Sequence, residues 1–316
     1  MVDKFIDYIS GIRRYSVRTQ EIYRKVLDNY LEFCGGEFGT DILTPALIRG
    51  YEVHLLDDCS ESPRTVNLHL SVLSSFCKFL MKQGVLESNP VHLIARPKQE
   101  KRLPAFYREE SMKEYFRQTA GTPEYGTYKA QLSRLIVSIL YSTAMRRSEL
   151  IGLRLRDYDK SRRVLKIRGK GDKMREIPLI SSLNEELLLY LQSVDEKFGS
   201  IGAGEEPLLR TEKGGALYPV YVDRAIKQEL GAVEGISGKK SPHVLRHTLA
   251  TELLNDGTDL NSIKELLGHS SLAATQVYTH NTAEKLKKVY ENAHPRAKTE
   301  VNYENQSEVT EIRRKR

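Results

Sequence analysis

The sequence is poor in cysteine and has no long apolar run. Its 316 residues include only three cysteines, Cys34, Cys59 and Cys77, all in the first third. Such a small, odd number argues against a disulfide framework or a zinc site and favours reduced, buried thiols in a cytosolic protein. No stretch approaches the roughly 18 apolar residues of a membrane-spanning helix, and MVDKFIDYIS lacks the basic start and apolar core of a signal peptide. We therefore expect a cytoplasmic protein without a membrane partner.

Motifs for metal and nucleotide chemistry are missing as well. No group of acidic residues has the spacing of a divalent-metal site, and no glycine-rich Walker loop is present. His243 and His247 have the spacing of a zinc pair on a helix. However, Arg246 would place a permanent cation beside the metal, and no carboxylate or thiolate lies nearby. We therefore expect neither a metal nor any other cofactor.

The composition is that of a globular chain whose second part is basic. Hydrophobic residues make up 40% and charged residues 29%, and the formal net charge is +7. Residues 1–100 carry 12 basic and 13 acidic residues, whereas residues 101–295 carry 31 and 25. The basic excess suits a polyanionic partner such as nucleic acid, although a charge this small also occurs in proteins that bind none.

Apolar periodicity predicts a helical domain over residues 1–97. SVRTQEIYRKVLDNYLEFC and SPRTVNLHLSVLSSFCKFL each begin with a Ser or Thr start signal and continue with apolar residues at helical spacing. The second helix has another face that is small and hydrogen-bonding, formed by Asn67, Ser71, Ser74, Ser75 and Lys78. That face is either solvated or close to a phosphate backbone, and helix geometry alone favours solvation.

A linker and a second domain follow. ARPKQEKRLPAF has two prolines and few apolar residues, which predicts a linker at residues 98–105. Within residues 106–295, QLSRLIVSILYSTA is helical, RRVLKIRGKGDKMREIPLI has two β-prone runs around a Gly-Lys-Gly-Asp turn, and helix returns after Pro178. We expect a mixed α+β domain with a small antiparallel sheet. Residues 296–316 lack apolar periodicity and are predicted to be a mobile, charged tail.

The segment SPHVLRHTLATELL has the features of an anion site. Ser241 suits the N-cap of a helix and Pro242 its first position, so His243 falls in the first turn. Free N–H groups and the helix dipole favour an anion there, and Arg246 projects from nearly the same side. A helix that merely carries polar residues is the alternative.

A second cationic cluster favours the anion site. YSTAMRRSELIGL is predicted to end one helix near Thr143 and to begin another near Ser148, which leaves Arg146 and Arg147 in the turn. Glu149, three residues after Arg146, could orient its guanidinium group. Two arginines from distant segments are what a clamp on phosphate oxygens requires, because arginine stays charged and forms bidentate contacts.

The segment LNSIKELLGHSSLAATQVYTH adds two further candidates. Its apolar residues predict a helix that Gly268 ends as a C-terminal cap. His269 follows immediately, and Tyr278 lies nine residues later on a predicted short helix. A single tyrosine among 17 is weak on its own, so its assignment depends on its neighbours.

Together these segments resemble the tyrosine recombinases of the phage-integrase family, in particular the compact Xer-type members. The resemblance is carried, in the family's order, by TAMRRSEL, RGKGDKMREIPL, HVLRHTLATELL, LLGHSSLAATQVYTH and TAEKLKKVYENAHPRA. SVRTQEIY and SPRTVNLHLSVLSSFCKFL, followed by NPV, resemble the family's core-binding domain. The resemblance covers nearly all of residues 1–296. It implies an all-α, SAM-like core-binding domain and a mixed α+β catalytic domain.

The resemblance also implies roles for individual residues. The catalytic set would comprise Arg146, Lys170, His243, Arg246, His269 and Tyr278, with Tyr278 as the nucleophile. The family's usual Gly-Leu before the first arginine is Ala144-Met145 here, and Arg147 and Lys173 remain rivals of Arg146 and Lys170. His247 has no role in the family's chemistry and is assigned to packing or support.

The expected activity is site-specific cutting and rejoining of duplex DNA through a 3′-phosphotyrosyl intermediate. The resemblance implies two domains that close around DNA as a C, and a tetramer on two recombination sites, with a second related recombinase as a candidate partner. A helix around TAEKLKKVYENAH would pack on a neighbouring protomer, or alternatively close its own domain. Chromosome-dimer resolution in the cytoplasm, at the nucleoid, is the expected role. The alternatives are a DNA invertase, a mobile-element integrase, a type IB topoisomerase and a DNA-binding relative without activity.

Overall fold

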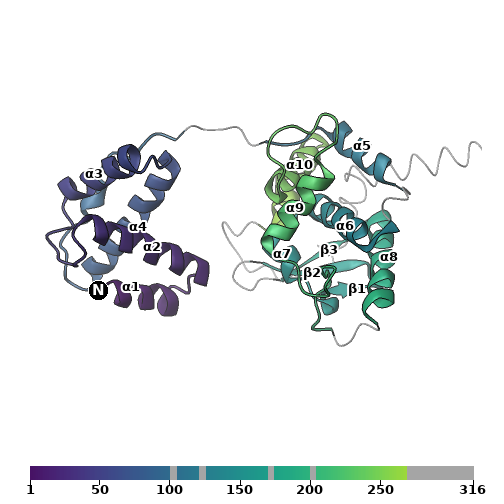
Figure 1. Ribbon diagram of the computed structural model, residues 1–316, viewed down its shortest axis with the longest axis horizontal. Helices are drawn as coiled ribbons and strands as arrows, with labels where there is room; N and C mark the ends of the chain where they lie inside the picture. The colour runs from purple at the N-terminus through teal and green to yellow at the C-terminus, as the bar shows by residue number, and fades with distance from the viewer. Residues whose placement is uncertain (100–104, 121–125, 170–173, 200–203, 269–316) are drawn as a thin grey trace, which may run out of the picture. The chain divides into compact units, whose positions relative to one another are not determined.

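The computed structural model describes residues 1–99, 105–120, 126–169, 174–199 and 204–268. The chain forms two compact units, Met1–Arg102 and Leu103–Arg316, and each has a hydrophobic core of its own (Figure 1). The division falls inside the predicted linker. Within the described part, no helix is long and apolar enough to cross a bilayer.

The N-terminal unit is entirely helical, as predicted. Its elements are α1 (Val2–Asp7), η1 (Tyr8–Ile12), α2 (Val17–Phe33), α3 (Pro45–Val53), η2 (His54–Asp58), α4 (Pro63–Lys82) and η3 (Pro90–Leu93). The predicted start signals are real N-caps, because Ser16 Oγ accepts from Thr19 N at 3.3 Å and Ser62 Oγ accepts from Thr65 N at 3.2 Å.

The polar face of α4 is covered from within the same unit. Asn67 Nδ2 donates to Pro97 O at 2.9 Å, Arg96 Nη1 donates to Ser71 Oγ at 2.9 Å, and Asn89 Nδ2 donates to Ser74 Oγ at 2.9 Å. The segment that follows α4 therefore folds back over these side chains and binds them. Solvation is therefore wrong for Asn67 and Ser74, which are buried, whereas approach of this face to a phosphate backbone stays a prediction.

The three cysteines do not share one environment. Cys77 is buried and Cys34 is partly buried, but Cys59 is exposed, and all three are free thiols. The prediction that all of them are buried is therefore wrong for Cys59, which lies just after η2 at the surface of its unit.

The C-terminal unit combines helices with a small sheet, which confirms the predicted mixed class. Its elements are α5 (Glu109–Thr119), α6 (Tyr128–Thr143), α7 (Arg147–Gly152), η5 (Leu155–Asp157), β1 (Tyr158–Asp159), β2 (Val164–Arg168), β3 (Met174–Pro178), α8 (Ser181–Phe198), α9 (Pro219–Glu229), α10 (Pro242–Asn255) and α11 (Leu260–Leu267). Helix α6 is central, because α8, α9 and α10 all pack against it (Figure 1).

The sheet is antiparallel with the order β1-β2-β3. The predicted hairpin is its β2–β3 pair, in which Ile167 faces Arg175 and Leu165 faces Ile177. The two-residue strand β1 was not predicted, since it is too short for a periodic pattern. Side chains alternate between faces along a strand, so Arg175 lies on the same buried face as Ile177.

Candidate active site

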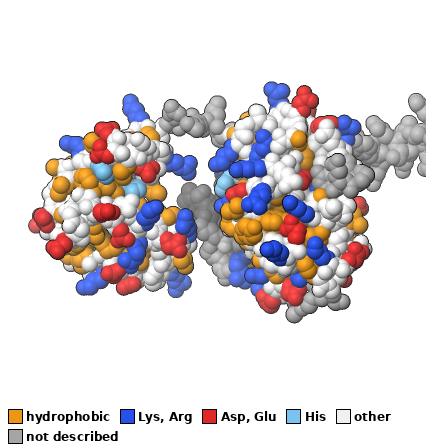
Figure 2. Space-filling model, viewed as in Figure 1, with side chains coloured by type: hydrophobic (Ala, Val, Ile, Leu, Met, Phe, Trp, Pro, Cys, Tyr) orange, Lys and Arg blue, Asp and Glu red, His pale blue; other side chains and the backbone are white. Residues whose placement is uncertain are grey.

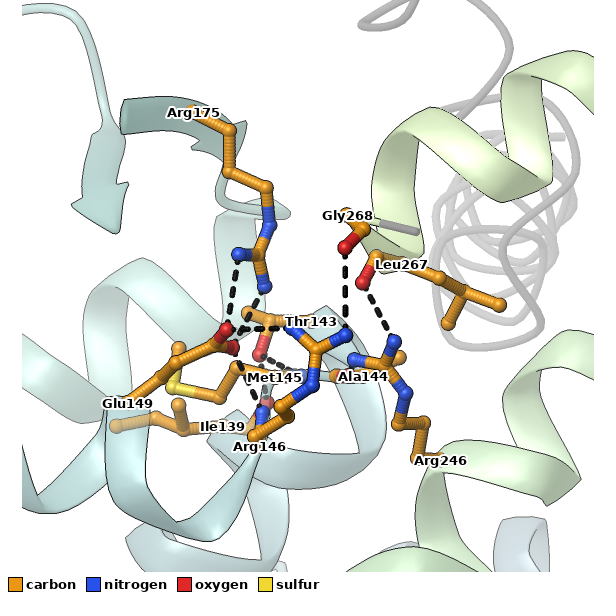
Figure 3. A network of polar contacts seen from close by, with 10 residues as sticks. All are labelled: Ile139, Thr143, Ala144, Met145, Arg146, Glu149, Arg175, Arg246, Leu267 and Gly268. Carbon is orange, nitrogen blue, oxygen red and sulfur yellow. Dashed lines mark hydrogen bonds and ion pairs between the residues drawn. The ribbon is translucent and has the colours of Figure 1, made fainter. Parts of the chain in front are cut away.

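The site is built around the end of α6. Thr143 Oγ1 donates to Ile139 O at 2.6 Å and accepts from Met145 N at 3.3 Å, which closes the last turn (Figure 3). Ala144 then adopts the left-handed conformation, with φ 48° and ψ 24°, although it carries a Cβ atom. This turn redirects the chain from α6 into α7 and presents Arg146 as the N-cap of α7.

Helix α7 begins at Arg147, one residue before the predicted start near Ser148, so Arg147 lies in the helix and not in the turn as expected. Glu149 Oε2 accepts from Arg146 N at 2.8 Å, which satisfies one free N–H at the start of the helix. Arg146 is therefore the cap residue, whereas Arg147 occupies the first helical position. The two neighbouring arginines consequently point to different partners.

Glu149 holds the guanidinium group of Arg146, as the three-residue spacing predicted. Arg146 Nη1 donates to Glu149 Oε1 at 2.8 Å, and the Glu149 side chain is only 5% exposed. Burial alone would raise the pKa of this carboxyl. Hydrogen bonds from Arg175 and from the Arg146 backbone outweigh burial and hold its pKa below the ordinary range. Glu149 is therefore an ionised carboxylate inside the protein.

Arg175 is a site residue that sequence reasoning missed. Its Nη1 and Nη2 atoms donate to Oε1 and Oε2 of Glu149 at 3.1 and 2.7 Å, in a bidentate pair (Figure 3). The residue is 6% exposed. Its alternation with Ile177 on β3 could have indicated that it points inward, but nothing in the sequence identifies its partner.

Arg246 reaches the same place from α10. Its Nη1 donates to Ala144 O and its Nη2 to Leu267 O, both at 2.5 Å. Only 8% of the residue is exposed. Burial, and then the positive charge of Arg146, lower the pKa of Arg246 to about 10, so the side chain remains a cation at neutral pH.

The two predicted arginines bind consecutive carbonyl groups. Arg246 Nη2 binds Leu267 O, and Arg146 Nη2 donates to Gly268 O at 3.2 Å. These carbonyls end α11, where the helix dipole is negative and attracts cations. Gly268 caps α11 with φ 61°, and a Cβ atom added there would lie 3.1 Å from Arg175 Nη1. The close approach of Arg175 and the left-handed backbone therefore both favour glycine at this position.

The cluster has an excess of positive charge. Arg146, Arg175 and Arg246 meet only one carboxylate, Glu149, among the contacts of this network (Figure 3). Each guanidinium carries five N–H donors, so Arg146 and Arg246 keep donors beyond those that bind Glu149 and the carbonyls. The arrangement can therefore hold a dianionic phosphate between two fixed guanidinium groups.

His243 lies in the first turn of α10, as predicted, and its side chain is exposed. Partial burial lowers the pKa of His243, and the positive charges of Arg147 and Arg246 lower it further. The ring is thus neutral at pH 7 and can accept a hydrogen bond or a proton. His247 is also exposed, so of its two predicted roles packing is wrong, and support of the site stays a prediction.

Arg147 is directed elsewhere. Its Nη1 donates to Asp223 Oδ2 on α9 at 2.5 Å. Arg146, in contrast, shares the carbonyl groups at the end of α11 with Arg246, so the structure brings Arg146 and not Arg147 together with Arg246. Lys170, its rival Lys173, His269 and Tyr278 lie outside the described residues. Among all the described residues, at this site or away from it, no three His, Cys, Asp or Glu side chains form a group that could hold a metal ion.

Family models match most of the chain. Residues 116–285 match the model described as the phage integrase family, and residues 2–84 match the phage integrase N-terminal SAM-like domain. Among similar proteins are two named tyrosine recombinase XerC. The one from Bacillus pumilus is 35% identical over 94% of this chain and 97% of its own length. The one from Chlorobaculum parvum is 35% identical over 94% of each.

Solved structures show the same fold at lower identity. XerH recombinase bound to a palindromic difH substrate is 20% identical, with a TM-score of 0.63 over 92% of this chain and 84% of that one. The Tn1549 transposon integrase in complex with a circular intermediate DNA is 17% identical, with a TM-score of 0.67 over 91% and 99%. With its two matching domains and its arginine pair, this chain belongs to the phage integrase family of tyrosine recombinases.

Proposed function

We propose that this protein is a site-specific DNA recombinase that resolves chromosome dimers. Membership of the family makes it an enzyme that cuts and rejoins DNA. The observation that supports the proposed site is the convergence of Arg146 and Arg246 on the consecutive carbonyls of Leu267 and Gly268. The guanidinium groups of the partly exposed Arg146 and the buried Arg246 at one place suit a phosphodiester, whose transition state carries two negative charges on its non-bridging oxygens.

In the proposed mechanism, the arginines bind those oxygens and Tyr278 attacks the phosphorus. A bond forms between the tyrosine oxygen and phosphorus, while the bond from phosphorus to the 5′-oxygen breaks. A phenol has a pKa near 10, so its proton needs an acceptor, and His243 is neutral and close to the arginines. Lys170 gives a proton to the leaving 5′-oxygen. Attack by a 5′-hydroxyl then reverses these steps and rejoins the strand.

The remaining parts of the proposal concern assembly and role. His269, which directly follows Gly268, would donate to the scissile phosphate. Four protomers would assemble on two sites in double-stranded DNA at the nucleoid of the cytoplasm, with a second related recombinase as a candidate partner. The XerC names of the relatives support chromosome-dimer resolution over inversion or integration. The DNA complexes of the structural neighbours are in keeping with a duplex substrate.

Covalent trapping tests this proposal. The protein is incubated with fragmented host DNA and denatured with detergent, and the protein-linked DNA is recovered and sequenced. We expect adducts at one chromosomal locus for wild type and for the control Tyr218→Phe, which changes an exposed tyrosine at the start of α9, and none for Tyr278→Phe. Adducts at scattered inverted repeats would contradict dimer resolution and would indicate that the protein is a DNA invertase. Relaxation of supercoiled plasmids without preference for a site would indicate a type IB topoisomerase. If wild type and both variants bind DNA but none forms an adduct, the proposed phosphotyrosyl intermediate is contradicted.

Paired substitutions in the same assay distinguish the rival residues. Arg146→Lys removes a bidentate contact that depends on the planar guanidinium group, so adduct formation should fall about 10²- to 10³-fold. Arg147→Lys should cost at least tenfold less. Lys170→Ala and Lys173→Ala form the second pair, and the lysine that supplies the proton is the one whose loss is rescued by a DNA substrate with a 5′-phosphorothiolate leaving group. Equal effects within either pair would contradict the assignment.

A further inference from the structure

A thiol, an imidazole and a carboxylate meet in the N-terminal unit, at the end of η2. Cys59 is exposed and free, and its Sγ atom lies 3.4 Å from Nε2 of His54. On the other side of the ring, Nδ1 of His54 lies 2.7 Å from Oδ2 of Asp58. Figure 2 shows histidine side chains at the surface of this unit close to acidic ones. A thiol joined in this order to a base and to a carboxylate is the arrangement that activates a cysteine as a nucleophile.

The backbone of η2 explains why these three side chains meet. The segment HLLDDC forms a π-helical turn, in which Cys59 N donates to His54 O at 3.0 Å, five residues back. In a regular α-helix, the residue four positions after His54 would face it, but the residue five positions after it would not. The wider π turn brings both Asp58 and Cys59 to the same ring. The cluster therefore depends on a local backbone feature that helical periodicity does not predict.

Aromatic side chains hold the imidazole ring in place. The ring of Phe33, at the end of α2, is stacked on His54, with centroids 5.2 Å apart and planes 30° apart. Tyr51 on α3 lies nearly parallel to the same ring, with centroids 6.5 Å apart. Because Asp58 accepts from Nδ1–H, the lone pair of Nε2 is free to accept from the thiol of Cys59. His54 is therefore oriented as a base toward this thiol.

The other two cysteines are the natural comparison. Burial raises the pKa of the Cys34 thiol, and it raises the pKa of Cys77 to about 12. Both therefore remain thiols at neutral pH, whereas the thiolate is the form that reacts. Cys59 combines exposure to solvent with a base that can take its proton. Of the three cysteines, it is the one placed to react.

We propose that Cys59 is a modification site, at which the thiol forms a mixed disulfide with a small-molecule disulfide. His54 Nε2 takes the proton from Cys59 Sγ, and the thiolate attacks one sulfur of the reagent. The S–S bond of the reagent breaks as the new S–S bond forms, and the leaving thiolate takes the proton from His54. Cys59 is thus oxidised to a disulfide while half of the reagent is reduced to a thiol. The exposed product can be reversed by a second small thiol, and none of these steps depends on the proposed function.

The rate of this exchange tests the proposal. Full-length protein is incubated with glutathione disulfide, and the modified cysteine is located and followed in time by peptide mass spectrometry. We expect Cys59 to react about tenfold faster than Cys34 and Cys77, and about tenfold faster than Cys59 in protein unfolded in urea. The unfolded reference separates activation from exposure, because the thiol is accessible in both states. A folded rate no higher than the unfolded rate would overturn the proposal, and so would modification by hydrogen peroxide but not by glutathione disulfide.

Substitutions of the two partners identify what activates the thiol. His54→Gln should slow the reaction of Cys59 about tenfold, because glutamine cannot take a proton. Asp58→Asn should slow it about threefold, and Asp58→Glu, which keeps the carboxylate, should restore most of the rate. Asp57→Asn and His92→Gln change exposed residues of the same unit and should react like wild type. Denaturation midpoints show that each variant is folded under the conditions of the assay. If Asp57→Asn slows the reaction as much as Asp58→Asn, or if His54→Gln reacts like wild type, the proposal fails.

Discussion

Two buried glutamates of the C-terminal unit, Glu149 on α7 and Glu252 on α10, show how surroundings decide a carboxyl's charge. The Glu149 side chain is 5% exposed, and residue Glu252 is 6% exposed. Glu149 accepts from two arginines, whereas the one bond described for Glu252 is from Tyr141 OH at 2.8 Å. Burial raises the pKa of Glu252 to about 8, while the arginines hold the pKa of Glu149 low. The ionised carboxylate holds two arginines together, whereas the neutral acid accepts a hydrogen bond from a core tyrosine.

Arg175→Gln should remove the main cause of the difference between Glu149 and Glu252. Of the substitutions predicted here, it should have the largest effect on the free energy of unfolding. It leaves Glu149 buried with one cationic partner instead of two. A buried charge that loses its partner altogether costs about 3–5 kcal/mol, and because Arg146 remains we expect a loss near the lower end of this range. Because the pKa of Glu149 is depressed, its stabilisation is present above its unfolded value near 4.3 and is lost as the pH falls through the folded pKa. The free energy of unfolding should therefore differ most from wild type above about pH 5, as measured by denaturant titration.

A double variant separates the pair from general damage to the core. Arg175→Gln with Glu149→Gln removes both charges, so it should lose less stability than the two single substitutions added together. Adduct formation should still fall about 100-fold in both Glu149 variants, because Arg146 loses its fixed orientation. Additive losses of stability would show that Arg175 and Glu149 do not act as a pair.

Glu252→Gln should remove the opposite pH dependence. The folded state keeps a proton on Glu252 that the unfolded chain releases above about pH 4.5, so wild-type stability falls as the pH rises from 4.5 to about 8. Glutamine keeps an acceptor for Tyr141 and cannot ionise. The variant should match wild type near pH 4.5 and exceed its free energy of unfolding by a few kcal/mol at pH 8.

The exposed Glu234 provides the matched control for this titration. Glu234→Gln should leave the dependence of stability on pH unchanged. Denaturant titrations of the three proteins between pH 4.5 and 8 make the comparison. A Glu252→Gln profile parallel to wild type would mean that Glu252 is ionised in the folded protein, like Glu149.

The sequence allowed the arginines of the site to be predicted, but not the network that holds them. Arg146, Glu149 and Arg246 could be found because a helix boundary, a three-residue spacing and a helix N-terminus are local features. Arg175 could not, because its partner lies on a helix distant in the chain and its pairing depends on the packing of β3 against α7. The neutral state of Glu252 could not be predicted for the same reason, since only its burial in the folded protein keeps the carboxyl protonated.

The polar face of α4 gives the converse case. Asn67, Ser71 and Ser74 have the appearance of a binding surface, but the segment after α4 already forms hydrogen bonds with them. Ser241 looked like an ordinary cap and proved to be buried without a partner. A sequence gives the number of polar groups, whereas only the fold shows which of them have partners.

Gly268→Ala should disturb the pair of Arg175 and Glu149, because residue 268 lies next to the Arg175 guanidinium group. Alanine at φ 61° is strained, and its Cβ would press on Arg175 at 3.1 Å, so we expect a loss of about 1–2 kcal/mol and reduced adduct formation. Gly257, with φ 79° and no atom within 4 Å of an added Cβ, is the matched control. Gly257→Ala should lose about 1 kcal/mol and keep its activity. Equal activities of the two variants, measured at matched fractions folded, would contradict a role for the close approach.

Ala144→Gly should have the smallest effect, and it should be a gain. Ala144 is left-handed at φ 48°, which costs a residue with a Cβ atom about 1–2 kcal/mol, whereas glycine adopts this conformation freely. The greater freedom of glycine in the unfolded chain offsets about 0.4–1 kcal/mol of that relief. A net gain of about 0.5 kcal/mol should therefore appear as a higher denaturation midpoint.

The control for this change is an alanine in regular helix. Ala225→Gly, within α9, should lose about 1 kcal/mol, because glycine has no strain to relieve there. The carbonyl of residue 144 remains available to Arg246 in Ala144→Gly, so adduct formation should equal that of wild type. A stable but less active Ala144→Gly protein would mean that the rigidity of alanine holds this carbonyl against Arg246. In that case the strain at the end of α6 would belong to the function of the site that Glu149 organises.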